Sequence, residues 1–180
     1  MHSVKLENWS LWIEDGSLPD IYSLYIEHAD FVDEIDMQNP EGKFCFLGIR
    51  EGVSVGSWPS TVVTQKYKDE GGFNPGILVV PDTSLVFVGA GERLLCYDMK
   101  KPCKLWEEQT NVGFWEWDRV GQYVLMMAEL EFGVWTTSGE KLWSTFVEPP
   151  WNFTVTGDTV ELDVLGITRT LRLSDGKPAE

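Results

Sequence analysis

Carboxylates and tryptophans are the side chains in this sequence that are best suited to catalyse a reaction or bind a ligand. The chain has 29 acidic residues and nine tryptophans, but only two histidines, His2 and His28. Neither histidine has a second histidine or a cysteine at the spacing of a metal site, so we expect both to lie at the surface. The sequence also lacks a glycine-rich phosphate loop, a nucleophile elbow and a His-Glu-x-x-His motif. We therefore expect no metal site and no cofactor.

Two pairs of carboxylates are close enough in sequence to act together. Glu129 and Glu131 flank a predicted turn, and Glu161 and Asp163 would share one face of a strand. Such a pair can act as an acid and a base only if its pKa values are pushed apart. Nothing in the sequence separates them, so solvated surface positions are the simpler interpretation. A hydrolase or sugar-binding protein, with two carboxylates about 5 to 9 Å apart in a channel, stays open as an alternative.

Two aromatic clusters occupy similar positions about 36 residues apart. The first is Phe114-Trp115-Glu116-Trp117-Asp118 and the second is Pro149-Pro150-Trp151-Asn152-Phe153. Strand alternation places Trp115 and Trp117 on one face. Aromatic anchors in a concave site favour binding of proteins or sugars. The candidate binding residues are therefore Trp115, Glu116, Trp117, Asp118 and Trp151, with packing between sheets as the alternative.

The negative charge is concentrated near the N-terminus. The net charge is −15, and residues 1–40 contain nine acidic residues against Lys5 alone. Such a field repels nucleic acid and anionic lipid, and it can steer a basic protein partner. Solubility alone is the competing explanation. The candidate partner surface comprises Asp30, Asp33, Glu34 and Asp36.

The cysteines and the first residues indicate a cytoplasmic protein. The N-terminal stretch has no apolar signal segment, and no apolar run approaches the roughly 18 residues of a membrane span. Cys45, Cys96 and Cys103 are an odd number without metal or redox spacing. Cys96 and Cys103 flank a predicted hairpin turn, so a disulfide between them stays open. The alternative is a buried Cys96 and a free thiol at Cys103.

Short stretches rich in β-branched and aromatic residues recur along the chain, separated by Gly, Pro, Asp or Asn every seven to ten residues. This pattern predicts an all-β protein. Only residues 20–37 also fit helical spacing, with Asp20 as a possible N-cap. Because Tyr22, Leu24 and Ile26 alternate, we predict mostly strand there.

The sequence repeats at intervals of 37 or 38 residues. Lys104-Leu105-Trp106 aligns with Lys141-Leu142-Trp143, and the strand around Leu85 aligns with that around Tyr123. We predict one domain, 1–180, with units at about 30–68, 74–110, 112–148 and 151–180 and N-terminal strands within 1–29. The first unit is divergent, with strands at 31–36, 44–49, 53–58 and 61–67. Four units of four-stranded antiparallel meanders are typical of a propeller-like array.

The fourth unit contains only three good strands. A segment at residues 4–13 is predicted as an unassigned strand. Propellers close when one terminus completes the blade of the other, so we expect this N-terminal strand to close the last blade. An open half-propeller is the alternative.

The segment from Asp82 to Asp98, followed by Lys104-Leu105-Trp106, resembles the repeat of quinoprotein-type and WD-like β-propellers. The next unit keeps Trp135, Ser138-Gly139-Glu140-Lys141 and Trp143. The resemblance covers residues 76–180 and is weakest in the fourth unit. The layout of the repeats is similar to that of small bacterial proteins with this repeat. It implies a fold. The cofactor-ligating residues of quinoprotein dehydrogenases do not map onto this sequence, so neither quinone nor calcium is implied.

Together these features favour a non-enzymatic, cytoplasmic protein-binding module with an acidic surface and a partner that is a protein, most simply a basic one. The hydrolase or sugar-binding alternative would use the channel. A third hypothesis is a subunit that completes a larger propeller assembly with another chain. No membrane or nucleic-acid partner is expected.

Overall fold

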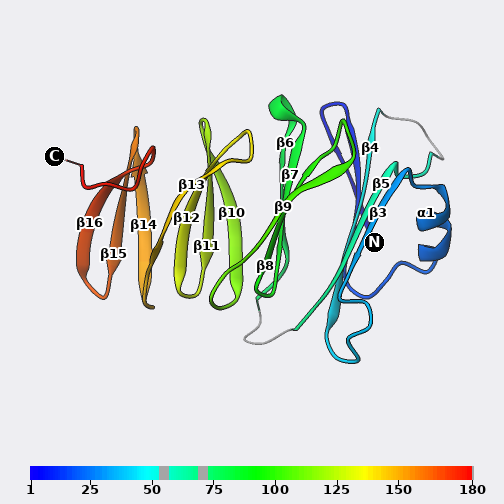
Figure 1. Cartoon of the computed structure of the whole chain (residues 1–180), viewed down its shortest axis with the longest axis horizontal. Coiled ribbons are helices and arrows are strands. Elements are labelled where there is room, and N and C mark those ends of the chain that lie inside the picture. Colours follow the sequence, from blue (N-terminus) through cyan, green and yellow to red (C-terminus); the bar gives the residue numbers. More distant parts are fainter. Residues whose placement is uncertain (53–56, 69–72, 180) are drawn as a thin grey trace.

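Four β-sheets stand side by side in a row (Figure 1). The computed structural model describes residues 1–52, 57–68 and 73–179. The all-β prediction is confirmed, with one short helix, α1 (Tyr22–His28), at the outer end of the row. No helix among these residues is long and apolar enough to cross a membrane.

The second and third sheets are four-stranded antiparallel meanders. The second contains β6 (Gly76–Val80), β7 (Leu85–Ala90), β8 (Arg93–Asp98) and β9 (Cys103–Gln109), with a 3₁₀ turn η1 (Pro81–Thr83) after β6. The third contains β10 (Phe114–Val120), β11 (Tyr123–Ala128), β12 (Glu131–Thr136) and β13 (Lys141–Phe146). The fourth sheet has three strands, β14 (Trp151–Thr156), β15 (Thr159–Val164) and β16 (Ile167–Arg172).

The first sheet departs from the repeat. It contains β1 (His2–Leu6), β2 (Trp9–Gly16), β3 (Phe31–Ile35), β4 (Lys43–Glu51) and β5 (Thr61–Tyr67), in the order β1-β2-β4-β5-β3. Strand β3 runs parallel to β5, so this sheet is not a simple meander. Of the strand expected at 53–58, residues 53–56 lie outside the described residues, and Ser57 and Trp58 are not in a strand.

The prediction that the N-terminal strand closes the last blade is wrong. Strands β1 and β2 form a hairpin, and β2 pairs along its whole length with β4 of the first sheet. The physical reason is local packing, because Trp9 and Leu11 of β2 are buried in the core between the first and second sheets. The fourth sheet therefore does not receive a strand from the N-terminus.

Strand was also the wrong prediction for residues 22–28. They form α1, which lies against the face of the first sheet that points away from the second (Figure 1). Tyr25 is buried there, with its ring 5.3 Å from that of Phe46 and 5.7 Å from that of Trp58. Tertiary packing of one helical face therefore outweighs the alternating pattern.

Three apolar cores join neighbouring sheets in sequence order: first with second, second with third, and third with fourth. No cluster of buried residues in the described part of the chain joins the fourth sheet to the first, and these two sheets stand at opposite ends of the row (Figure 1). The array is therefore an open row, as in the half-propeller alternative, and not a closed ring.

The outer face of the fourth sheet is polar. Facing residues of its three strands share one side, in the rungs Asn152–Asp163–Thr168, Thr154–Glu161–Thr170 and Thr156–Thr159–Arg172. The opposite side carries Trp151, Leu162 and Leu171, which pack on the third sheet. A face made of these polar side chains can end the stack in water.

Candidate functional site

The candidate binding residues of the third sheet are divided between its two faces. Strand β10 has a β-bulge at Trp115, because Phe114 pairs with Ala128 while Glu116 pairs with the adjacent Met127. The extra residue reverses the alternation. Trp117 therefore packs toward the second sheet, and Trp115 packs toward the fourth. The prediction that Trp115 and Trp117 share a face is wrong for this reason.

Trp115 and Trp151 are brought together between the third and fourth sheets. Their rings are stacked, with centroids 5.2 Å apart and planes inclined by 8°. Phe73 lies near Trp115 as well, with a centroid distance of 6.4 Å. Glu129 holds both indoles, because its carboxylate accepts from Trp115 Nε1 and its backbone carbonyl accepts from Trp151 Nε1, each at 3.2 Å.

This arrangement leaves little aromatic surface for a ligand. Trp151 and Trp117 are buried, and Trp115 is half-buried between Trp151 and Phe73. Glu116 and Asp118 of the same strand are exposed. A sugar ring stacks on an open aromatic face, so these tryptophans serve mainly as packing between sheets.

The predicted acidic surface is largely occupied by contacts within the chain. Asp33 accepts a hydrogen bond from the Tyr97 hydroxyl at 2.8 Å and lies 3.1 Å from Lys104 Nζ. Asp36 pairs with Arg93 at 2.5 Å, and Glu34 accepts from the Tyr22 hydroxyl at 2.7 Å.

These contacts join β3 to the second sheet and to α1. Burial, together with the nearby carboxylate of Asp33, raises the pKa of Tyr97 above its usual range, so its hydroxyl remains a donor. Of the four predicted residues, only Asp30 has an exposed carboxylate without a hydrogen bond or ion pair in the described structure.

Another acidic region lies around α1. Asp20, Glu27 and Asp30 are exposed, and none of them forms an ion pair within the described part of the chain. Ile21 and Leu24 are 41 % and 39 % exposed on the same short segment. Sequence reasoning missed this combination because it predicted a strand there; helical spacing of Ile21 and Leu24 was the available signal.

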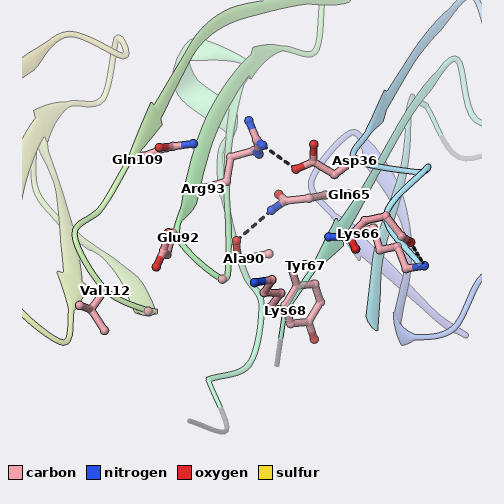
Figure 2. Close-up of a pocket in the computed structure, with 13 residues that line it drawn as sticks. Asp36, Gln65, Lys66, Tyr67, Lys68, Ala90, Glu92, Arg93, Gln109 and Val112 are labelled. Atoms are coloured by element: carbon pink, nitrogen blue, oxygen red, sulfur yellow. Dashed lines mark hydrogen bonds and ion pairs between the residues drawn. The ribbon is translucent and has the colours of Figure 1, made fainter. Parts of the chain in front are cut away.

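A polar cavity of about 270 Å³ lies between the first and second sheets (Figure 2). Gln65 of β5 reaches across it and donates from Nε2 to the Ala90 carbonyl at 2.8 Å. Its Oε1 is buried without a hydrogen-bond partner among the described residues. Arg93, on the other wall, pairs with Asp36 and also with Glu107. These two carboxylates balance the charge of Arg93. The cavity is therefore a polar contact region between the first and second sheets.

The three cysteines differ in burial. Cys45 and Cys96 are buried free thiols, and Cys103 is an exposed free thiol, so the disulfide alternative is not realised. Burial raises the pKa of Cys45 and that of Cys96 to about 12, which keeps both thiols protonated. No group of three or more His, Cys, Asp or Glu side chains in the described ranges could hold a metal ion.

No protein-family model matches the chain, and no curated protein matches it. Solved structures do resemble it. BamB from Moraxella catarrhalis is 11 % identical, with a TM-score of 0.49 over all of this chain and 50 % of that chain. The computationally designed protein Ika4 is 13 % identical, with a TM-score of 0.45 over 58 % of this chain and 69 % of that one.

A europium-containing methanol dehydrogenase is 12 % identical, with a TM-score of 0.39 over 60 % of this chain and 24 % of that chain. This chain therefore spans half or less of the two natural proteins. Similarity at this level does not transfer an activity. The strand pairing shows an all-β protein whose second and third sheets repeat the same four-stranded antiparallel meander.

Proposed function

We propose that this chain is a non-enzymatic cytoplasmic scaffold that binds a basic protein partner at its N-terminal end. The observation that carries the proposal is the segment 20–30 around α1, in which Ile21 and Leu24 are exposed and so are the acidic residues Asp20, Glu27 and Asp30. We call these five residues the α1 surface.

The two kinds of side chain have different roles in this proposal. Ile21 and Leu24 supply apolar contact area, and the carboxylates raise the encounter rate with a positively charged surface. The remaining acidic residues of the chain add to the same long-range field, since the net charge is −15. Asp33 and Asp36 contribute to the proposal only indirectly, because they hold the first sheet against the second.

The alternatives have less support. For sugar binding or hydrolysis, the tryptophans of the candidate site would need open ring faces, and these are covered by neighbouring rings. For a subunit of a larger ring, a neighbouring blade would need an apolar surface on the fourth sheet, whose outer face carries polar side chains.

Affinity capture with the full chain as bait, followed by mass spectrometry, tests the proposal. The triple variant Asp20→Asn, Glu27→Gln, Asp30→Asn should lose captured basic proteins. The control variant Glu116→Gln, Asp158→Asn, Glu161→Gln removes the same number of exposed carboxylates elsewhere and should keep them. Binding should also weaken between about 50 and 500 mM salt, because screening shortens the reach of the field. Equal loss in both triple variants, or binding insensitive to salt, would contradict a partner site at α1.

A further inference from the structure

The first sheet has an open edge at β1. Strand β1 pairs only with β2 among the described strands, and all five of its residues are exposed. The outer edge of such a strand presents unpaired N–H and C=O groups to solvent. Lys5 gives β1 one of the charges that protect natural edges, but β1 has no proline and its register with β2 is regular, without a bulge.

One face of β1 extends the apolar core of the molecule. Val4 lies opposite Leu11 and Leu6 lies opposite Trp9, so each pair shares a face of the sheet. Leu11 and Trp9 are buried against the second sheet, yet Val4 is 43 % exposed and Leu6 is 37 % exposed. The first sheet is one strand wider than the second, and β1 is the strand that is left uncovered.

We propose that two copies of this chain associate through antiparallel pairing of their β1 strands. A two-fold axis perpendicular to the sheet matches the hydrogen-bonding groups of one edge with those of its copy. The same axis keeps both copies of Val4 and Leu6 on one side, where they form a continuous apolar strip along the joint.

Charge is compatible with self-association at this edge. Residues 1–6 contain none of the nine acidic residues found in the first 40, so no carboxylates meet across the paired strands. Two chains of net charge −15 still repel each other at longer range. Salt screens that repulsion, so dimerisation should strengthen as ionic strength rises. This is opposite to the salt dependence expected for a basic partner at the α1 surface, so the two proposals can fail separately.

Sedimentation velocity of the full chain over a range of concentrations, at about 50 and 500 mM salt, tests the proposal. We expect a reversible increase in mass from 20.5 kDa toward twice that value, greater at high salt. The double variant Val4→Lys, Leu6→Lys places charges in the strip and should weaken the dimer by at least about tenfold.

The matched control is Val32→Lys with Leu105→Lys, two apolar residues that are 37 % and 46 % exposed on other edge strands. It adds the same charge and should leave the dimer intact. Measuring the melting temperatures of both variants would check that they fold. Hydrogen exchange should show that the β1 amides are protected at protein concentrations where the dimer forms. A wild-type chain that stays monomeric under all conditions, or a dimer that the β1 variant does not weaken more than the control, overturns the proposal.

Discussion

The rings of Trp115 and Trp151 stack between the third and fourth sheets, with their centroids 5.2 Å apart. Glu129 accepts a hydrogen bond from each indole, one at its carboxylate and one at its backbone carbonyl. Both tryptophans were candidates for ligand binding. In the fold both rings contribute to the contact between the third and fourth sheets.

Replacing Trp151 by alanine should therefore destabilise the protein. Trp151→Ala removes a buried ring that also packs near Phe132 and Phe153, so we expect a loss of about 3–5 kcal/mol in the free energy of unfolding. Urea unfolding followed by circular dichroism measures it. Phe146→Ala, at a position 59 % exposed on β13, is the control and should change stability by about 0.5 kcal/mol or less. Similar effects for both variants would show that the stack is not a major contact.

Gly89 has no room for a side chain because Phe114 of the next sheet lies directly above it. A Cβ at this position would lie 2.6 Å from ring atoms of Phe114. Gly89→Ala should destabilise the fold by about 1–3 kcal/mol, as overpacking does in a core. Combining it with Phe114→Leu should cost less than the sum of the two single changes, since the smaller side chain relieves the contact. Strict additivity in urea unfolding would argue against a direct clash.

The pKa of Asp175 should depend on Arg172. Hydrogen bonds from this arginine lower the pKa of Asp175 from 3.8 to about 2. A lowered pKa in the folded state means that the ionised carboxylate stabilises the fold above its ordinary pKa, and that this stabilisation is lost as pH falls toward 2. Arg172→Gln should return the pKa toward 3.8 in a carboxyl NMR titration. Arg169→Gln, which removes an exposed charge from the same strand, should not do so.

The three cysteines should differ sharply in reactivity. At pH 8, a thiol reagent should modify Cys103 rapidly and leave Cys45 and Cys96 unmodified, because burial raises the pKa of each to about 12. All three should react after unfolding. The raised pKa values also mean that stability falls as pH rises above about 9, where an unfolded thiol ionises but the buried one does not. Rapid native modification of Cys45 or Cys96 would contradict their placement in the core.

Several features of this protein follow from its sequence alone. Alternating β-branched and aromatic residues between Gly, Asp and Pro turns are sufficient to predict the meanders of the second and third sheets, because each hairpin is closed by local turn chemistry. The repeat spacing likewise predicts that neighbouring sheets bury one another, since a single sheet of this kind cannot cover both of its apolar faces. The free Cys103 was one of two outcomes that the sequence left open.

Other features depend on contacts between residues that are distant in sequence. Strand β2 joins the first sheet because Trp9 and Leu11 are buried in the core between the first and second sheets. Helix α1 forms because Tyr25 packs on Phe46 and Trp58. One bulged residue in β10 moves Trp115 to the opposite face from Trp117.

The tertiary structure likewise decides which acidic residues form contacts within the chain. The sequence predicted that Asp33 and Asp36 lie on a surface open to a partner. In the fold, Asp33 contacts Tyr97 and Lys104 of the second sheet, and Asp36 pairs with Arg93. Local propensity therefore determined the strands and turns of the repeat, whereas packing and charge pairing across the sheets decided which acidic and aromatic residues remain available to a partner.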